Sequence, residues 1–245
     1  MTHVLAVIPA RYASTRFPGK PLALIDGRPM IQHVWERVNQ AEGIDAVVVA
    51  TDDPRIEEAV LTFGGTVRMT DPTHPSGTDR IWEVAQSVPE ASLVLNVQGD
   101  EPHIDPLMLG ELVAAMQARP AADILTVVRP IATRGEWENP NLVKAALAVS
   151  GQVLYFSRAA IPCVRDGLAG DDLPAGLWGH LGVYLYRREA LARFTTLPPS
   201  PLEQLEKLEQ LRAMEAGMRI EAIITAEAPV GVDTPEDLTR LTTGR

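Results

Sequence analysis

Uninterrupted hydrophobic runs alternate with helix-like segments along the first half of the chain. The runs lack the polar–apolar alternation of a strand with one wet face, so they predict strands buried on both faces. They are Val4–Ile8, Ala46–Ala50 and Leu93–Val97, with a shorter strand at Thr66–Met69. A helix pattern covers Met30–Gln40, and helix-opening motifs stand at Asp53-Pro54, Ser76–Asp79 and Asp105-Pro106. This order predicts βαβ crossovers and an α/β fold, with a Rossmann-like, mostly parallel sheet flanked by helices.

From about residue 124 the rhythm changes, and strand-like segments follow one another closely. They are Ile124–Val128, Val143–Val149, Val153–Ser157 and His180–Tyr186. We expect an antiparallel insertion at about 124–186 within a single domain, 1–245, that forms an arm suited to pairing subunits. A capping box at Ser200–Glu203 then opens a helix, Arg219–Thr225 reads as a strand, and Thr234 caps the last helix.

Composition narrows the class of protein. The chain has 245 residues, 46% of them hydrophobic, and a formal net charge of −10. That acidic balance argues against non-specific binding to nucleic acid and against stable association with an anionic membrane. No apolar run approaches the ~20 residues of a membrane helix, and the first run follows no basic segment, which favours a strand over a signal peptide. A single cysteine, Cys163, excludes an intrachain disulfide and fits a reducing cytoplasmic compartment.

Open α/β sheets bind ligands at the carboxyl ends of their strands. This rule selects four loops, at residues 9–20, 51–53, 98–102 and 230–233. The first loop holds three cations, Arg11, Arg16 and Lys20, which suit the oxygens of a phosphate group. It is not a Walker A loop, and the chain has no G-x-G-x-x-G dinucleotide motif. The alternative is an ordinary solvated basic loop; its place after a buried strand favours the phosphate site.

The loop at 98–102 carries Gln98, Asp100 and Glu101 directly after a buried strand. Carboxylate oxygens beside phosphates suit Mg²⁺, which takes one or two protein carboxylates and completes its shell with water and phosphate oxygens. Taken alone, the loop is better interpreted as a turn in which Asp and Glu cap the helix after Pro102. Asp233 changes this balance, because Thr234 already caps the last helix and leaves Asp233 for another role. Two strand-end aspartates beside a basic loop therefore indicate a metal–triphosphate site.

Three further features have both structural and functional interpretations. On the helix from Pro201, the stripe of Leu202, Leu205 and Leu208 places Glu209 toward the buried side, as a structural ion pair or a ligand contact. The strand at 180–186 predicts Leu181, Val183 and Leu185 toward the core. Its other face groups polar side chains that suit a sugar pocket, a wet face or a subunit contact: His180, Tyr184 and Tyr186. Two arginines are either solvated or carboxylate ligands: Arg80 and Arg158.

Ten stretches of the sequence resemble motifs of the 3-deoxy-manno-octulosonate (Kdo) cytidylyltransferases, the CMP-Kdo synthetases of lipopolysaccharide biosynthesis. The resemblance covers nearly the whole chain, and the first loop alone would indicate only a broad nucleotidyltransferase superfamily. The matching stretches are Ile8–Arg16, Pro18–Leu22, Ala50–Asp53, Ser76–Arg80, Asn96–Pro102, Tyr155–Arg158, His180–Tyr184, Pro198–Glu203, Leu208–Arg212 and Gly231–Leu238.

The resemblance implies a nucleotidyltransferase fold and the reaction CTP + Kdo → CMP-Kdo + diphosphate with Mg²⁺, in a homodimer. By analogy, Arg11, Arg16 and Lys20 hold the triphosphate, Ser76 and the Pro9–Ala10 backbone read the cytosine, and Gln98 contacts nucleotide and sugar. Asp100 and Asp233 hold the metal; with Arg11 and Lys20 they form the catalytic set. The remaining residues surround the sugar acid: Arg80, Arg158, His180, Tyr184 and Glu209. Departures from the family pattern are mild: Phe17 stands where Leu is frequent, and the segment 162–179 looks individual.

Other functions stay open on the sequence. A sialic-acid cytidylyltransferase is expected to carry Asn after the loop lysine, where this chain has Pro21. An 8-amino analogue of Kdo is a further possible substrate, and a sugar-1-phosphate nucleotidyltransferase would use a phosphate as acceptor. A non-catalytic nucleotide sensor would keep the cavity without turnover, and the intact set of Lys20, Asp100 and Asp233 argues against it. No side chain is identified as a general base, so we expect the metal to activate the attacking hydroxyl.

Overall fold

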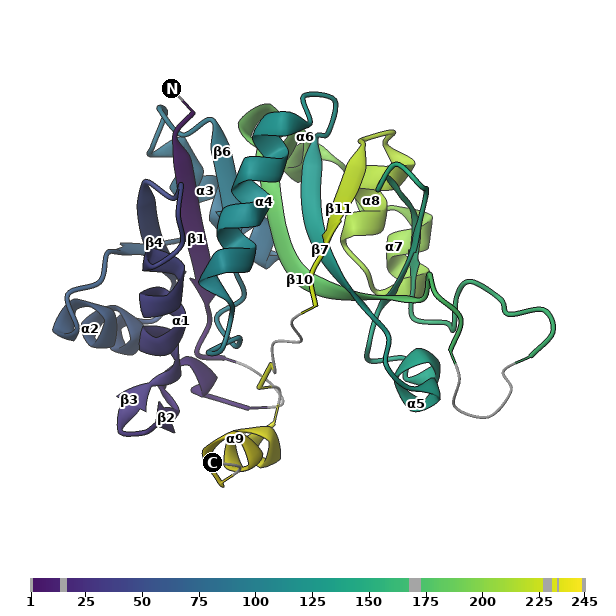
Figure 1. Cartoon of the computed structure of the whole chain (residues 1–245). Helices are drawn as coiled ribbons and strands as arrows, with labels where there is room; N and C mark the ends of the chain where they lie inside the picture. Colours follow the sequence, from purple (N-terminus) through teal and green to yellow (C-terminus); the bar gives the residue numbers. More distant parts are fainter. Residues whose placement is uncertain (1, 14–16, 168–172, 227–230, 233, 244–245) are drawn as a thin grey trace. The chain divides into compact units, whose positions relative to one another are not determined.

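The structure is a computed structural model that describes residues 2–13, 17–167, 173–226, 231–232 and 234–243 (Figure 1). The chain folds into two compact units. Unit 1 contains Met1–Ala114 and Pro229–Arg245, and unit 2 contains Ala115–Ala228. Unit 2 includes the whole range 124–186, for which the sequence predicts an insertion into a single domain; that division into domains stays a prediction. Within the described residues, no helix has both the length and the apolar character needed to cross a membrane.

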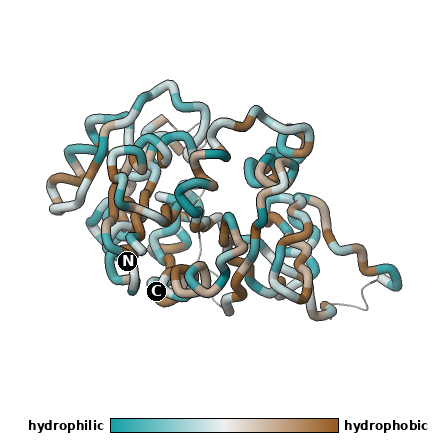
Figure 2. The backbone as a smooth tube through the Cα atoms, turned by 90° about the horizontal axis from the view of Figure 1, so that it is seen from above, coloured by the Kyte–Doolittle hydropathy of each residue, from teal (hydrophilic) through white to brown (hydrophobic). Residues whose placement is uncertain are grey.

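A parallel sheet forms the centre of unit 1, with the strand order β6-β1-β4-β5. The first strand is buried along nearly all its length, which explains its uninterrupted hydrophobic sequence. The strands are β1 (Val4–Ala10), β4 (Ala46–Thr51), β5 (Val67–Met69) and β6 (Leu93–Asn96), and a separate short ribbon pairs β2 (Leu24–Ile25) with β3 (Arg28–Pro29). Brown hydrophobic stretches alternate with teal hydrophilic stretches along the backbone tube in Figure 2.

Helices connect these strands and cover both faces of the sheet. The crossover from β1 to β4 runs in one direction along the sheet and the crossover from β5 to β6 in the other, so right-handed connections place α1 and α3 on opposite faces (Figure 1). The helices are the 3₁₀ helix η1 (Lys20–Leu22), α1 (Met30–Asn39), α2 (Pro54–Thr62), α3 (Gly77–Gln86), α4 (Pro106–Ala118) and α9 (Pro235–Thr243). The change of direction makes the edge between β1 and β6 a topological switch point, where loops 9–20 and 98–102 begin.

Hydrogen bonds confirm the N-caps that the sequence predicts for helices of unit 1. Asp53 caps α2 by accepting from the Arg55 amide at 3.0 Å. Ser76 caps α3 by accepting from the Asp79 amide at 3.2 Å. At the last helix, the Thr234 hydroxyl accepts from the Asp237 amide at 3.2 Å. Each cap satisfies a helix amide that has no partner within the helix.

The C-terminal segment returns to the strand ends of unit 1. Val232 is fully buried and packs with Ile25 and Met30, and Leu238 and Leu241 of α9 pack against the same cluster. The amide of Val232 donates to the carbonyl of Asp100 at 2.9 Å. The start of the last helical region is therefore fixed against loop 98–102.

A mixed sheet forms the centre of unit 2. Strand β7 pairs antiparallel with β10 and parallel with β11, and β8 pairs antiparallel with both β9 and β10. The strands are β7 (Ile124–Pro130), β8 (Lys144–Leu147), β9 (Val153–Ser157), β10 (Trp178–Arg187) and β11 (Ile220–Ile224), and the helices are α5 (Arg134–Glu138), α6 (Arg188–Thr196), α7 (Pro201–Glu206) and α8 (Gln210–Glu215). The antiparallel pairing predicted for this region is confirmed, and the strands and helices of each unit agree with the predicted α/β class.

The continuous helix predicted from Pro201 is wrong. Lys207 adopts a left-handed conformation (φ 53°) and ends α7, and α8 begins after Glu209. The leucine stripe is consequently absent, and Leu205 is 80% exposed. The residue before this break is held by distant contacts: the carboxylate of Glu206 accepts from the Ser157 hydroxyl at 2.6 Å and from the Arg158 amide at 2.9 Å.

Lys144 is a charged residue of unit 2 that lies buried and needs hydrogen-bond partners there. Its side chain is fully buried, and the ammonium donates to the carbonyls of Asn139, Leu142 and Arg158 at 2.8, 2.7 and 2.6 Å. We expect Lys144→Met to destabilise the protein by about 3 kcal/mol, because three part-buried carbonyls lose the donor that they share. Urea unfolding measures the loss. Arg134→Met, which removes only the exposed pair with Glu138, is expected to cost under ~0.5 kcal/mol; equal losses in the two variants would contradict the prediction.

Candidate active site

A cavity of about 320 Å³ opens at the carboxyl ends of the unit 1 strands. Three loops from different parts of the sequence line the cavity. Residues that the sequence analysis selected separately therefore lie together at the strand ends. The lining residues are Pro9, Ala10, Arg11, Lys20, Pro21, Pro75, Ser76, Gly77, Gln98, Gly99 and Asp100.

The basic loop presents two of its three cations to this cavity. The Lys20 ammonium donates to the Asp100 carboxylate at 2.6 Å and to the Val232 carbonyl at 2.9 Å. Gly19 has a φ of 72° and its amide donates to the Tyr12 carbonyl at 2.9 Å, which turns the chain so that Lys20 begins η1. Arg11 donates to the carbonyl of His74. The third predicted cation, Arg16, lies outside the described residues.

Loop 98–102 lies against the first loop. A Cβ on Gly99 would lie 3.0 Å from the Pro9 carbonyl oxygen, so only glycine allows this approach without displacement. Gln98 donates its side-chain amide to Asn96 at 3.4 Å. Glu101 is half-buried, and its enclosed Oε2 has no hydrogen-bond partner among the described residues; desolvation together with Asp100 raises its pKa to about 8. Sequence reasoning placed Glu101 in this loop and gave no sign of this enclosure.

The structure describes one of the two residues that are predicted to hold the metal ion. Asp100 lines the cavity, while Asp233 lies outside the described residues. Among the residues that are described, His, Cys, Asp and Glu side chains do not form a group of three or more suited to holding a metal ion. Mg²⁺ at a phosphate site does not need such a cage. The assignment of Asp100 and Asp233 therefore stays a prediction.

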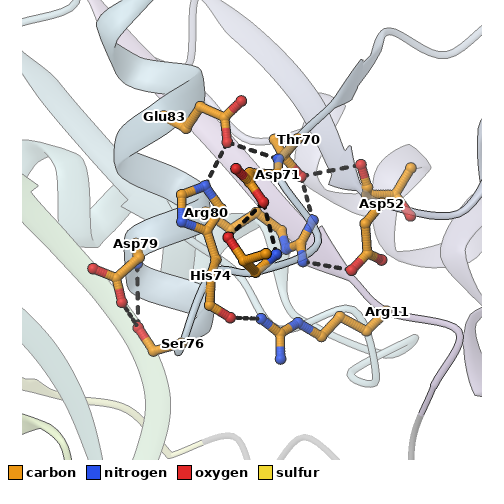
Figure 3. A network of polar contacts seen from close by, with 11 residues as sticks. Arg11, Asp52, Thr70, Asp71, His74, Ser76, Asp79, Arg80 and Glu83 are labelled. Carbon is orange, nitrogen blue, oxygen red and sulfur yellow. Dashed lines mark hydrogen bonds and ion pairs between the residues drawn. The ribbon is translucent and has the colours of Figure 1, made fainter.

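Ser76 and Arg80 stand on the same turn of α3 in different surroundings. The Ser76 hydroxyl lines the cavity and donates to the Asp79 carboxylate at 2.7 Å. Arg80 is fully buried: its guanidinium donates to the Thr70 hydroxyl and, at 2.8 Å, to the Asp52 carboxylate (Figure 3). The alternative of a solvated Arg80 is wrong, since these partners hold it inside unit 1. Its predicted contact with a substrate carboxylate is untested.

Unit 2 contains the other predicted sugar-binding residues. On β10, Leu181, Val183 and Leu185 are buried as predicted. The wet-face alternative fails at His180 and Tyr186, which are also buried. The ring centroids of His180 and Tyr184 are 5.3 Å apart, and those of Tyr184 and Tyr186 are 6.0 Å apart, so the three side chains share one face as predicted.

Arg158 and Glu209 have partners within unit 2. Arg158 donates to the backbone carbonyls of Glu206, Pro140 and Lys207 at 2.8, 3.0 and 3.3 Å. Glu209 precedes α8 and its carboxylate lies 4.0 Å from Arg212, an ion-pair contact of the kind that the sequence analysis weighed. Their roles toward a sugar acid stay predictions.

Burial makes His180 a source of acid sensitivity. Its Nε2 lies 2.8 Å from the Thr126 hydroxyl, and burial lowers its pKa from 6.5 to about 3. Below pH 6.5 the unfolded state therefore binds a proton that the folded state excludes. We expect stability to fall as pH decreases from 6.5 to 3, with His180 contributing up to about 1.4 kcal/mol per pH unit. Unfolding free energies of wild type and His180→Gln across this range measure it; an unchanged slope in the variant would contradict the prediction.

Two contacts at the cavity were missed by sequence reasoning. The His74 carbonyl holds Arg11, and the Val232 carbonyl holds Lys20. Both acceptors are backbone atoms, which leave no side-chain signature. The only available signal is position: His74 precedes Ser76 by two residues, and Val232 precedes Asp233.

Comparison with known proteins agrees with this geometry. Residues 5–220 match the family model described as cytidylyltransferase, so the chain belongs to the cytidylyltransferases. Two curated relatives define the group more closely. The 3-deoxy-manno-octulosonate cytidylyltransferase of Syntrophotalea carbinolica is 53% identical over 243 residues, covering 97% of this chain and 96% of the relative. That of Geobacter sulfurreducens is 47% identical over 245 residues, covering 98% of each. The chain is a member of the 3-deoxy-manno-octulosonate cytidylyltransferase family.

Solved structures are similar over the same extent. A CMP:2-keto-3-deoxy-manno-octonic acid synthetase complexed with CTP has a TM-score of 0.92 and 45% identity, with 98% of this chain and 97% of that chain covered. A cytidylyltransferase from Leptospira borgpetersenii, at 17% identity, a TM-score of 0.67 and coverage of 99% and 86%, shares the fold. The predicted nucleotidyltransferase fold is confirmed.

Proposed function

We propose that this protein couples CTP to Kdo, giving CMP-Kdo and diphosphate, and so activates Kdo for lipopolysaccharide biosynthesis. One observation carries the proposal: Arg11, Lys20, Ser76 and Asp100 come from three loops and line one strand-end cavity. The high identity to enzymes named for this reaction supports it.

The cavity supplies groups suited to each part of CTP. Arg11 and Lys20 offer positive charge to the triphosphate, and a guanidinium forks onto two phosphate oxygens where an ammonium acts as a point charge. The Ser76 hydroxyl and the backbone of Pro9 and Ala10 line the same cavity and are assigned to the cytosine. Arg16 completes the triphosphate set in this proposal, on the family resemblance alone.

The donor chemistry fits Mg²⁺. A carboxylate at the phosphate end of the cavity, Asp100, is the hard oxygen ligand that this ion selects. The Val232 amide bonds to the Asp100 carbonyl at 2.9 Å, so the residue directly before Asp233 lies beside Asp100. Asp100 and Asp233 would hold the ion. When bound, Mg²⁺ neutralises phosphate charge and lowers the pKa of a coordinated hydroxyl.

The reaction itself needs positioning more than covalent help from the protein. The C2 hydroxyl of Kdo attacks the α-phosphorus in line, the new C2–O–P linkage forms, and the bond to the diphosphate breaks. Lys20 and Arg11 stabilise the charge that gathers on the phosphate oxygens. No side chain in the described cavity is assigned as the base.

The residues proposed for the sugar acid rest on the family resemblance. Gln98 lines the cavity, and His180, Tyr184, Glu209, Arg158 and Arg80 complete the set on the family resemblance. Because His180 is neutral, it offers hydrogen bonds to sugar hydroxyls rather than charge. The guanidinium groups of Arg80 and Arg158 are suited to binding the carboxylate of the sugar acid.

We also propose that the enzyme is a cytoplasmic homodimer. Unit 2 exposes Val149, and Leu154 of β9 is 58% exposed. Hydrophobic side chains at the β8–β9 hairpin are what a pairing arm would bury. The free thiol of the single cysteine, Cys163, agrees with a reducing compartment.

Product mass and diphosphate release test the proposal. CTP and Kdo with Mg²⁺ are expected to give CMP-Kdo, and ATP, GTP and UTP are expected to give far less product. Omission of Mg²⁺ should stop the reaction. Preference for 8-amino-Kdo or a sialic acid would replace the proposed sugar, and CTP binding without any product would indicate a sensor instead.

A further inference from the structure

Arg11 is held by a neutral partner at the edge of the cavity. Its Nη2 donates to the backbone carbonyl of His74 (Figure 3). In the described part of the chain no carboxylate forms an ion pair with Arg11, whereas neighbouring Arg80 is paired with Asp52. A carbonyl fixes the plane of a guanidinium without cancelling its charge. The Arg11 charge thus stays available for an anion.

Arg11 has a further donor without a partner among the residues that the structure describes. Its Nε is buried, and no described residue accepts a hydrogen bond from it. A buried donor without a partner is costly, and an anion in the cavity would satisfy it. The guanidinium is therefore oriented in advance by one hydrogen bond and retains donors for phosphate oxygens.

The position of the His74 carbonyl depends on a second set of contacts behind the loop. The His74 ring contacts the carboxylate of Glu83, a residue of α3 (Figure 3). The same Glu83 oxygen accepts from the Asp71 amide at 3.0 Å. Glu83 thus fastens the loop before Ser76 at two points to a rigid helix that Ser76 itself caps.

We propose that His74 and Glu83 are positioning residues: they hold the loop so that its carbonyl orients Arg11 toward the triphosphate. The inference rests on the proposed binding of CTP in this cavity. Neither side chain lines the cavity, so neither touches the nucleotide in this role. When a charged donor is already oriented, less conformational entropy is lost when it binds a phosphate group.

Side-chain variants at these positions leave the Arg11 acceptor in place, because that acceptor is backbone. A loss of affinity in these variants, at an unchanged melting temperature, is then expected to come from a change in the position of the loop. We expect His74→Ala and Glu83→Ala each to weaken CTP binding about 10-fold in calorimetry, as loss of one well-placed charged hydrogen bond does. Glu83→Gln keeps an acceptor oxygen and is expected to stay within about 3-fold of wild type. The KM for Kdo should not change.

A matched control separates this role from general stability. Glu36 lies on α1 of the same unit, and its carboxylate is 2.8 Å from the Arg28 guanidinium. Glu36→Ala breaks this ion pair. It should leave CTP binding unchanged. Melting temperatures of all variants are measured together, and losses of CTP affinity that follow the melting temperature rather than the site would overturn the proposal.

Two further comparisons test whether His74 affects CTP binding through Arg11. In an Arg11→Ala background, His74→Ala is expected to add no further loss of CTP affinity; an equal additional loss overturns the proposal. Inorganic tripolyphosphate has no base for Ser76 to contact, and its binding is expected to weaken in His74→Ala as CTP binding does. Weakening of CTP alone would place the effect at the base and reject the role. Because binding is measured without turnover, a wild type that binds CTP but forms no product would reject the proposed function and leave this test intact.

Discussion

Asp100→Asn is expected to lower kcat about 1000-fold at saturating substrates, with a larger deficit at limiting Mg²⁺. The change keeps the size of the side chain and removes the negative charge that would hold the metal. Loss of several kcal/mol of charge stabilisation in the transition state corresponds to about three orders of magnitude in rate. It also removes the charge partner of Lys20, whose ammonium lies 2.6 Å from the carboxylate.

Steady-state rates across a Mg²⁺ titration measure this effect. Asp105→Asn is the matched control, because Asp105 caps the start of α4 by accepting from the Leu107 amide at 3.0 Å, and asparagine caps equally well. That variant is expected to keep wild-type activity. Wild-type turnover of Asp100→Asn at limiting Mg²⁺ would remove Asp100 from the metal site.

The second large effect is expected for Lys20→Met, a loss of about 100- to 1000-fold in kcat/KM for CTP. In the proposed function the ammonium is a preorganised charge for the triphosphate, and removal of one such donor typically costs this much. Lys20→Arg should recover little of the activity, because a planar guanidinium does not reproduce the ammonium that reaches both the Asp100 carboxylate and the Val232 carbonyl.

Initial rates against CTP concentration measure the loss. Arg28→Met removes a basic side chain that pairs with Glu36 on the surface of the same unit, and we expect it to leave kcat/KM unchanged. Full recovery of activity in Lys20→Arg would mean that positive charge alone suffices. A normal kcat/KM in Lys20→Met would exclude Lys20 from triphosphate binding.

Local sequence signals were sufficient for the elements that build the cavity. The buried strands β1 and β4 have no alternation because both faces are covered, and Asp53 and Ser76 cap their helices by contacts within three residues. The strand-end rule then selected the first loop and loop 98–102 without knowledge of any contact. These signals are local, so the sequence carries them directly.

Contacts between distant residues decide what the sequence did not predict. Lys207 ends α7 in a left-handed conformation that glycine usually supplies, and the adjacent Glu206 bonds to Ser157, 49 positions earlier in the chain. The register of β10 against β7 shifts between Leu181 and Tyr184, which a two-residue period does not anticipate. Pairing of Arg80 with Asp52 is likewise invisible in spacing.

The return of Val232 to loop 98–102 sets an order of events during synthesis. In the sequence, all of unit 2 lies between the two segments of unit 1, so the ribosome makes residues 1–114 well before the segment from residue 229 onward. The carbonyl that holds Lys20, and the amide that bonds to Asp100, belong to that later segment. A nascent chain thus carries the cationic loop long before the segment that holds Lys20 is made.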